Sequence, residues 1–380
     1  MDPKITIPFN KPFLTGGEID YIRKAIRSGK ISGNGIFTQK CHEFFKTRYG
    51  FSKVLLTTSC THALEMASLL IGLNPGDEVI IPSYTFVSTA NAFILHGAKV
   101  IFADSGKISP HLDIQAIEPL INDRTRAIVP VHYAGIACDM DPLLKLAQKY
   151  NLYIIEDAAQ SIDSKYRERY LGSIGHLGTF SFHETKNVNA GEGGMLVINE
   201  PSFHDRSEII WEKGTNRSAF FRGEVDKYNW IDIGSSYLPS EIVAAFLYAQ
   251  LEHLGEIQDK RIRLWNHYYD RLKELEEKAY LTLPYLPDYA TNNGHLFYII
   301  LPDLATRTSL INHLKDKGIL SVFHYLSLHR SPFYHSRHDG RELPYSDRYS
   351  DCLLRLPLFY ELEERQVDMI CDEIYKFFCR

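Results

Sequence analysis

The chain alternates short apolar runs with stretches in which apolar positions recur at helical spacing. Turn sequences such as NPGD at 74–77 separate these units. The predicted strands are 53–57, 78–81, 100–103, 127–131, 152–156, 179–182 and 195–198. Predicted helices between them include 61–71, 88–96, 114–121 and 142–150. This rhythm predicts an α/β fold, in which a mostly parallel seven-stranded sheet is flanked by helices.

The pattern changes in the last third of the chain. From 240 to 277 the apolar spacing is helical throughout, which predicts a helix that links two domains. Beyond it, a predicted strand at 296–301 is mixed with predicted helices, which include 308–317 and 363–378. The sequence therefore predicts a large domain at 1–250 and a small C-terminal α+β domain at 251–380.

Composition narrows the class of protein. The 380 residues are 44% hydrophobic, which is enough for a large core, and the net charge is −5 with basic residues dispersed along the chain. Nucleic acid is therefore not an expected partner. No apolar run approaches the ~18 residues of a membrane span, and the N-terminus has no apolar signal core. Six cysteines without a CxxC pair predict reduced thiols in a cytoplasmic enzyme, and sixteen histidines without ligand spacing predict no metal site.

One lysine, Lys186, stands in a polar turn within the stretch 178–194, GTFSFHETKNVNAGEGG. A lone lysine at a strand edge in a tight loop is where a Schiff-base enzyme holds an aldehyde cofactor. Ser181 could place a hydroxyl on the phosphate of that cofactor. A surface lysine in a glycine-rich hairpin explains this segment alone almost as well.

An acidic residue, Asp157, closes the predicted buried strand at 152–156, where α/β folds bind ligands. Pyridoxal 5'-phosphate (PLP) needs a carboxylate that keeps its pyridine nitrogen protonated, so that the ring accepts electrons. An isolated aspartate at a strand end more often caps a helix or pairs with an arginine. Asp157 and Lys186 on successive strands together favour PLP.

A third segment offers an anion site. The predicted strand at 53–57 runs into a helix start whose Ser59 hydroxyl and free backbone N–H groups suit a phosphate. Ser59 would serve equally as an ordinary N-cap. After the next strand, Phe86 could stack on a cofactor ring or belong to the core.

These segments resemble the sugar aminotransferases of the DegT/DnrJ/EryC1/StrS family, which have the PLP-dependent transferase fold of type I. The likeness extends from 7–12 to 356–360. It is strongest to members that aminate C4 of dTDP-4-keto-6-deoxyglucose to give dTDP-4-amino-4,6-dideoxygalactose. The stretches that carry it are PGDEVIIPSYTFVSTANAF, VPVHYAG, EDAAQS, FSFHETKN, EKGTNRSAFFRG, VDKY and DIGSSYL.

The resemblance implies roles at the cofactor. Lys186 matches the Schiff-base lysine, and Asp157 matches the carboxylate on the pyridine nitrogen. Further implied contacts are Cys60, Thr61 and Ser181 at the phosphate, Phe86 on the ring face and Gln160 beside the phenolic oxygen. In many relatives an asparagine of the partner subunit also reaches the phosphate, and Ser236 stands at that position here.

Two further clusters are candidates for substrate binding. The resemblance places His324, Tyr325 and His329 near the sugar, although a core tyrosine with rim histidines fits equally well. Arg217 and Arg222 lie in a polar, aromatic loop that could clamp a nucleotide diphosphate or simply be solvated. The family likeness favours contact with the substrate.

The resemblance also implies a ping-pong reaction in a homodimer whose active sites are built from two subunits. L-Glutamate donates its amino group and leaves as 2-oxoglutarate, and the keto sugar then accepts that group. Lys186 moves protons in both halves.

Four alternatives are weighed against this activity. The related PLP-dependent dehydratases carry histidine in place of Lys186. The 3-keto-sugar aminotransferases tend to carry a GDGG-like stretch where this chain has GEGG at 191–194. Amination to the gluco (viosamine) epimer would use the same cofactor residues. A non-catalytic PLP-binding regulatory protein has no feature in its favour.

Overall fold

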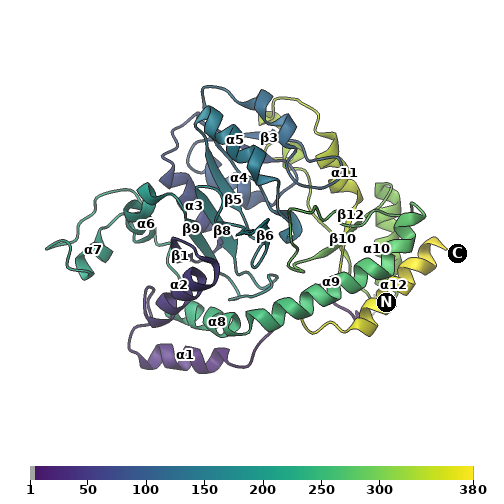
Figure 1. The fold of residues 1–380 in the computed structure, drawn as a ribbon, viewed down its shortest axis with the longest axis horizontal. Helices are drawn as coiled ribbons and strands as arrows, with labels where there is room; N and C mark the ends of the chain where they lie inside the picture. The colour runs from purple at the N-terminus through teal and green to yellow at the C-terminus, as the bar shows by residue number, and fades with distance from the viewer. Residues whose placement is uncertain (1–4, 380) are drawn as a thin grey trace.

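A seven-stranded sheet lies at the centre of the molecule, for which a computed structural model describes residues 5–379 (Figure 1). Its strands are β1 (Lys53–Thr57), β2 (Glu78–Pro82), β3 (Lys99–Ala103), β4 (Thr125–Ile128), β5 (Tyr153–Asp157), β8 (Leu177–Ser181) and β9 (Gly194–Ile198). Their order is β1-β9-β8-β5-β4-β2-β3. β9 runs antiparallel to β1 and β8, whereas the pairs from β8 to β3 are parallel. The predicted mostly parallel α/β sheet is confirmed.

Helices cover both faces of this sheet. One face packs against α3 (Cys60–Leu70), α4 (Val87–Ile94) and α6 (His204–Trp211). The other packs against α2 (Ile36–Tyr49), α5 (Met140–Tyr150) and α8 (Glu241–Glu252), and α1 (Glu18–Arg27) lies along α8. Val79, Ile80 and Ile81 of β2 are fully buried, as expected for an apolar strand covered on both sides.

A second core belongs to the C-terminal part, which is the predicted small α+β unit. It packs α9 (Leu254–Glu277), α10 (Leu304–Asp316) and α12 (Glu364–Phe378) against the sheet β10-β12-β11. The elements of this sheet and its neighbouring helix are β10 (Phe297–Ile300), β11 (Val322–Phe323), β12 (Leu353–Leu356) and α11 (Pro344–Cys352). Ile7 joins this core through a bridge to Ile319. We propose that the domain boundary lies where α8 gives way to α9.

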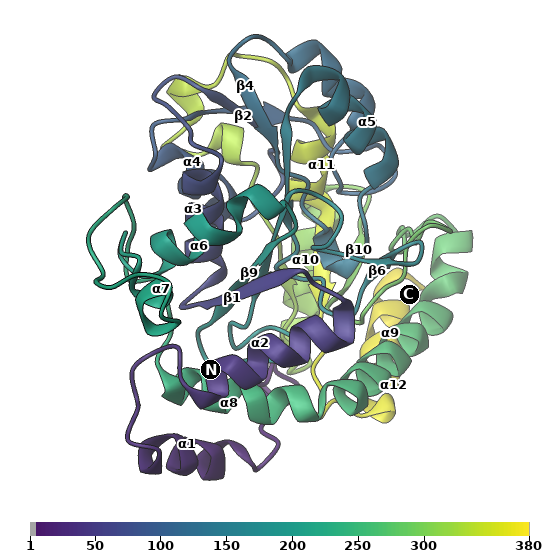
Figure 2. The same cartoon turned by 60° about the vertical axis from the view of Figure 1, so that its left-hand side comes forward.

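Two predicted helices differ from the structure. The segment 114–121 forms two short 3-10 turns, Ile114–Ala116 and Glu118–Leu120, because Pro119 lacks the backbone N–H that a continuous helix needs. The long helix predicted at 240–277 is broken at His253. As a result, α8 lies beside α1 and α2, whereas α9 runs to α12 (Figures 1 and 2).

Two peripheral features complete the fold. A small hairpin pairs β6 (Lys165–Tyr166) with β7 (Arg169–Tyr170). The segment that carries α7 (Arg217–Phe221) projects from the main body beside α6 (Figure 1). Within residues 5–379, none of the helices is long and apolar enough to cross a membrane.

Candidate active site

A cavity of about 560 Å³ lies between the carboxyl ends of the sheet strands and the small C-terminal unit. Ten residues singled out from the sequence line it, namely Ser59, Cys60, Thr61, Phe86, Asp157, Gln160, Ser181, Lys186, His324 and Tyr325. They come from five separate parts of the chain. The carboxyl edge of a parallel sheet is where α/β folds bind ligands, so the topology itself brings these side chains together.

One end of the cavity is the N-terminus of α3. The Ser59 side chain caps this helix by accepting a hydrogen bond from the His62 N–H (3.1 Å). The Thr61 hydroxyl donates to Ser88 Oγ (2.7 Å), and Ser181 lines the same side. A Cβ on Gly194 would lie 2.3 Å from the carbonyl carbon of Ser59, so only glycine lets β9 approach this turn. Hydroxyls at the positive end of a helix dipole form an anion site.

Asp157 provides the negative charge of the cavity. Its carboxylate is buried, and it accepts hydrogen bonds from the Thr89 hydroxyl (2.7 Å) and the Ala159 N–H (3.2 Å). Burial raises the pKa of this carboxyl, and the hydrogen bond from Thr89 partly opposes the shift. Within residues 5–379 Asp157 forms no ion pair, so a protonated ring nitrogen would supply the partner that it lacks.

Lys186 is positioned by its neighbour Asn187. The buried Asn187 amide donates to Gln258 Oε1 (2.7 Å) and to the Asn293 carbonyl (2.8 Å), and it accepts from His295 Nδ1 (2.9 Å). Burial lowers the pKa of Lys186 to about 8. About a tenth of the amine is therefore unprotonated at pH 7, far more than for an ordinary lysine, and the free amine is the form that a nucleophile and proton carrier requires.

The small C-terminal unit closes the cavity from the opposite side. The Gln160 amide donates to the Tyr325 hydroxyl (3.2 Å), while its Oε1 accepts from the Ala134 N–H (2.6 Å). His324 Nδ1 lies 3.1 Å from the Tyr133 hydroxyl. Phe86 remains 54% exposed at the rim, with its ring 5.9 Å from that of Tyr325. One face of the Phe86 ring is thus open for a flat ligand.

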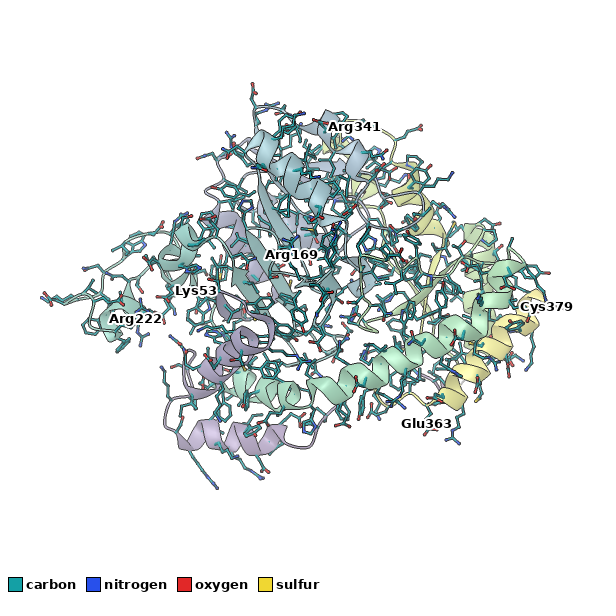
Figure 3. The ribbon with its side chains drawn as sticks, viewed as in Figure 1. Lys53, Arg169, Arg222, Arg341, Glu363 and Cys379 are labelled. Carbon is teal, nitrogen blue, oxygen red and sulfur yellow. The ribbon has the colours of Figure 1, made fainter. Side chains whose placement is uncertain are left out.

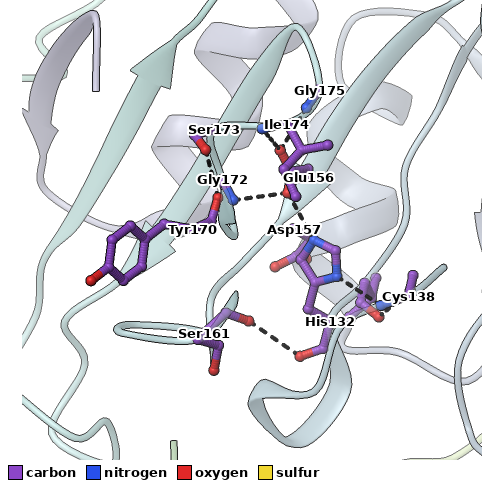
Figure 4. A network of polar contacts seen from close by, with 12 residues as sticks. His132, Cys138, Glu156, Asp157, Ser161, Tyr170, Gly172, Ser173, Ile174 and Gly175 are labelled. Carbon is purple, nitrogen blue, oxygen red and sulfur yellow. Dashed lines mark hydrogen bonds and ion pairs between the residues drawn. The ribbon is translucent and has the colours of Figure 1, made fainter. Parts of the chain in front are cut away.

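A buried polar network holds the strand that carries Asp157 (Figure 4). The neighbouring Glu156 points to the other side of β5, where it accepts hydrogen bonds from the N–H groups of Gly172, Ile174 and Gly175 (2.7–2.8 Å). His132 Nε2 donates to the same carboxylate (3.0 Å), because the Cys138 N–H occupies its Nδ1. The His132 N–H also donates to the Asp157 carbonyl (3.1 Å). The position of Asp157 along β5 is therefore fixed both by the hydrogen bonds to the Glu156 side chain and by the hydrogen bond to its own carbonyl.

Comparison with known proteins identifies the family. The model of the DegT/DnrJ/EryC1/StrS aminotransferase family matches residues 13–375. The chain belongs to this family. It is 30% identical, over 97% of its length and 96% of the relative, to the spore coat polysaccharide biosynthesis protein SpsC of Bacillus subtilis. Its fold matches DesV of S. venezuelae with a TM-score of 0.89 at 29% identity, covering 100% and 99% of the two chains.

A second solved structure extends the comparison. Helicobacter pylori PseC, an aminotransferase involved in the biosynthesis of pseudoaminic acid, matches with a TM-score of 0.90 at 25% identity, covering 98% of this chain and 99% of that one. The members of the family are sugar aminotransferases that use PLP, and PLP is therefore the cofactor of this enzyme.

The residues of the cavity fit PLP. Phosphate suits the N-terminus of α3, a protonated pyridine nitrogen suits the unpaired Asp157, and the cofactor aldehyde suits the Lys186 amine. We propose that Cys60, Thr61 and Ser181 hold the phosphate, and that Phe86 and Gln160 contact the ring. When bound, PLP supplies an electron sink for the negative charge that forms on a neighbouring carbon.

His329 does not reach the cavity, contrary to the expectation that it contacts the sugar. It is buried, with Nδ1 2.7 Å from the Ser83 hydroxyl and Nε2 3.7 Å from an Asp347 carboxylate oxygen. The resemblance placed it near the sugar together with Tyr325, but the chain turns at Ser327 into a short 3-10 helix that directs His329 elsewhere.

Three other expected contacts lie outside this cavity. Arg217 and Arg222 line a separate cavity of about 670 Å³ beside α7. Arg222, which lies on the projecting segment (Figure 3), pairs there with Glu208 of α6 (2.8 Å) and with Glu224 (2.7 Å). Ser236 is exposed at the base of that segment. Contact of these residues with cofactor or substrate would require the cavity of another subunit.

Sequence reasoning missed several residues of the cavity, including Thr89, His295 and Arg355. Thr89 was hidden within a stretch that already supplied Phe86, and its bond to Asp157 spans 68 positions. His295 and Arg355 lie on or beside strands of the small C-terminal unit, where an apolar alternation concealed them. A polar residue inside such an alternation, as in LLRLPL at 353–358, is the one local signal that could have revealed Arg355.

Proposed function

We propose that this enzyme transfers the amino group of L-glutamate to C4 of dTDP-4-keto-6-deoxyglucose, with dTDP-4-amino-4,6-dideoxygalactose and 2-oxoglutarate as products. The observation that carries the aminotransferase chemistry is the Lys186 amine, which has a pKa of about 8 and shares a cavity with Asp157 and the N-terminus of α3. The choice of sugar is supported by the stretches EDAAQS, FSFHETKN and EKGTNRSAFFRG, which carry the resemblance to family members that aminate C4 of this sugar.

The proton transfers are assigned to Lys186. With the cofactor bound, the free Lys186 amine would take the proton from Cα of the donor and return it to the cofactor carbon on the other side of the shared nitrogen. A pKa of about 8 allows both proton uptake and proton release near neutral pH. The same side chain works in the opposite direction on C4 of the sugar. Asp157 keeps the electron-accepting ring protonated in both halves.

The biological role proposed is the synthesis of a cell-surface polysaccharide in the cytoplasm. The relative SpsC is named for spore coat polysaccharide biosynthesis, which supports a polysaccharide product. The six cysteines, all within the described residues, are free, which supports a reducing compartment.

We also propose a homodimer with shared active sites. The projecting segment carries a set of exposed apolar side chains, namely Phe221, Tyr228, Trp230, Ile231 and Ile233. Trp230 is 82% exposed, which is unusual for a tryptophan on a free surface. A second copy of the chain would cover these side chains and could receive Arg217, Arg222 and Ser236 at its cavity.

The test follows the two half-reactions on the purified holoenzyme. L-Glutamate is expected to convert the visible absorbance of lysine-bound PLP into that of the aminated cofactor, and dTDP-4-keto-6-deoxyglucose is expected to restore it. NMR of the sugar product then assigns the galacto configuration. If only a 3-keto sugar restores the absorbance of lysine-bound PLP, the proposed acceptor is wrong. If the product has the gluco configuration, the proposed stereochemistry is wrong. Failure of glutamate to change the spectrum would remove it as the donor.

A further inference from the structure

His295 lies in the wall of the active-site cavity, just before β10 of the small C-terminal unit. Only 5% of this residue is exposed, and it lines the same cavity as Lys186. Its Nδ1 lies 2.9 Å from Asn187 Oδ1. Within residues 5–379, its Nε2 makes no hydrogen bond. One ring nitrogen is therefore bound by the protein, and the other is left for a ligand.

The surroundings of Asn187 decide which nitrogen of His295 carries the hydrogen. The Asn187 amide nitrogen lies 2.8 Å from the backbone carbonyl of Asn293, which can only accept, and 2.7 Å from Gln258 Oε1. The amide oxygen of Asn187 must therefore face His295, and it accepts the hydrogen of Nδ1. In a neutral imidazole the second nitrogen is then an acceptor.

The ring of His295 is neutral. Burial holds the pKa of His295 well below its ordinary value, and the positive charges of Lys186, Arg261 and Arg355 lower it further. At neutral pH, Nε2 of His295 therefore presents a lone pair and no hydrogen. A ligand group that meets it must be a hydrogen-bond donor.

The backbone around His295 holds this acceptor in place. The His295 N–H donates to Asn293 Oδ1 (3.0 Å), and the Arg261 guanidinium donates to the carbonyls of Gly294 (2.9 Å) and His295 (2.7 Å). The Asn293 amide also donates to the Gln160 carbonyl (2.8 Å) on the large domain. The acceptor is thus fixed before a ligand enters, which lowers the entropic cost of binding.

Few groups of the reactants can donate a hydrogen bond to this nitrogen. At neutral pH both carboxylates of L-glutamate only accept hydrogen bonds, and its one nitrogen is the atom that is transferred. The groups of the cofactor suit the N-terminus of α3, Asp157 and Gln160. The proposed keto sugar has hydroxyls at C2 and C3, and C3 is bonded to the reacting carbon, C4. The donors of the thymidine are separated from C4 by the diphosphate.

We propose that His295 Nε2 accepts a hydrogen bond from the C3 hydroxyl of the keto sugar and thereby selects sugars with a hydroxyl beside the reacting carbonyl. This inference rests on the proposed function, in which dTDP-4-keto-6-deoxyglucose is the acceptor. A sugar with hydrogen at C3 would leave the buried Nε2 without a partner. L-Glutamate makes no such contact, so the two half-reactions must respond differently to the loss of Nε2.

His295→Asn separates the roles of the two ring nitrogens. Its amide nitrogen can take the place of Nδ1 and donate to Asn187, but no atom reaches the position of Nε2. In the holoenzyme, the second-order rate constant of the sugar half-reaction should fall about 30-fold. The glutamate half-reaction should change by less than about threefold. His295→Gln, whose longer amide places an oxygen near the position of Nε2, should recover part of the loss.

A sugar nucleotide with hydrogen in place of the C3 hydroxyl removes the same contact from the ligand. Wild type should react with this analogue about 30-fold more slowly than with the keto sugar, whereas His295→Asn should treat the two alike within about threefold. A wild-type enzyme that does not distinguish the two sugars would overturn the proposal, even if the variants do not fold. A His295→Asn enzyme that distinguishes them as wild type does would locate the partner of the hydroxyl elsewhere.

Equilibrium binding gives a readout that needs no turnover. dTDP-6-deoxyglucose, which has no carbonyl, should bind the His295→Asn holoenzyme about tenfold more weakly than the wild-type holoenzyme by calorimetry. dTDP, which has no sugar to meet Nε2, should bind both equally. An equal loss of affinity for both ligands would show a general disturbance of the cavity and would contradict the proposal.

His111→Asn is the matched control variant. His111 is also buried, and its Nε2 lies 2.9 Å from the Ile136 carbonyl, outside the residues that line the cavity. This variant should carry out both half-reactions as wild type does. Equal losses in the two histidine variants would show a general effect of removing a buried histidine and would overturn the proposal.

Two further outcomes separate the role of His295 from the proposed function. If His295→Asn slows both half-reactions alike, the acceptor serves the Lys186 amine rather than the sugar, and the proposal is wrong. If wild type does not react with the keto sugar at all, the proposed function fails and the C3 contact fails with it.

Discussion

At the residue scale, the partial burial of the Lys186 amine has the largest consequence for the chemistry, because it lowers the pKa of that amine. Lys186 is partly buried in the wall of the cavity, and burial lowers its pKa from 10.5 to about 8, although Cys60 and Asp157 oppose the shift. The amine must be unprotonated to attack the cofactor aldehyde. Below pH 8 most of it is protonated and has no free electron pair.

The rate at which the apoenzyme forms a covalent bond with PLP should therefore follow the fraction of Lys186 that is unprotonated. It should rise about tenfold per pH unit while Lys186 is mostly protonated, and it should level off above about pH 8. Stopped-flow absorbance of apoenzyme mixed with PLP measures this rate. A rate that still climbs steeply toward pH 10.5 would show an ordinary lysine and contradict the role of burial.

Glu156 shows how a residue next to the active site acts through structure alone. Its carboxylate accepts four hydrogen bonds, from His132 Nε2 and from three backbone N–H groups between Gly172 and Gly175. Glu156→Gln replaces one acceptor oxygen by an NH₂ group that faces donors. We expect it to lower the free energy of unfolding by about 3 kcal/mol, as measured by urea denaturation.

Glu168→Gln is the control for this variant. The Glu168 side chain is 96% exposed, and its ion pair with Lys165 is 4.0 Å long. Its loss should change the free energy of unfolding by less than about 0.5 kcal/mol. Equal stabilities of the two variants would mean that the Glu156 network does not hold β5 in place.

Residue identity alone predicted only part of the site. Asp157 and Lys186 follow neighbouring strands and were found from the sequence because strand ends carry local signals. Arg355 and Asp157 are about 200 positions apart in the chain, and only the packing of the small unit on the sheet unites them. His329 shows the converse, since the resemblance placed it near the sugar with Tyr325, and the turn of the chain at Ser327 directs it away from the cavity.

At the scale of elements, the contact between β9 and the start of α3 shapes the anion site. A Cβ at Gly194 would lie 2.3 Å from Ser59 C and 2.4 Å from Cys60 N, closer than any side chain tolerates. Because both contacts are with backbone, the turn itself would have to move. The N–H groups of α3 would then point away from the phosphate.

Gly194→Ala should therefore weaken PLP binding by about tenfold or more. It should weaken binding of pyridoxal, which lacks the phosphate, far less. Equilibrium dialysis of the apoenzyme with each compound measures both effects. Gly255→Ala on α9 is the control, because nothing lies within 4 Å of its added Cβ. Equal losses of affinity for PLP and for pyridoxal would show that the substitution does not act at the phosphate site.

The sequence predicted the ends of most sheet strands to within two residues. Apolar runs such as Val79–Ile81 are stable only where both faces of the strand are buried in the sheet. The strand predicted at 127–131 is observed at Thr125–Ile128, ahead of Pro130. Pro119 also explains why 114–121 forms 3-10 turns rather than a helix. The break at His253 has no proline. The first turn of α9 still packs on the same core as α8, and the rest of α9, from Leu264 on, packs on the core of the small unit.

At the scale of the whole molecule, the exposed apolar surface of the projecting segment calls for a second copy. A shared active site would explain why Arg217, Arg222 and Ser236 lie away from the cavity of their own chain. Surface apolar area of this kind typically marks a protein interface. The described chain alone leaves Trp230 almost fully exposed.

Trp230→Arg should therefore convert the dimer to monomer and lower turnover at least about tenfold, as measured by sedimentation and by the sugar amination assay. Met369→Arg is the control, because Met369 is exposed on α12, at the opposite end of the molecule (Figure 1). A dimer that survives Trp230→Arg with full turnover would locate the interface on another surface.

The central claim is that nitrogen passes from L-glutamate to C4 of the dTDP sugar through a site built around Lys186. Its most direct test is incubation of the enzyme with PLP, L-glutamate labelled with nitrogen-15 and dTDP-4-keto-6-deoxyglucose. NMR of the isolated sugar nucleotide should show the label bonded to C4, and Lys186→Ala should give no labelled product although its fold is intact. A sugar nucleotide without the label, or labelling that continues in Lys186→Ala over many turnovers, would contradict the account.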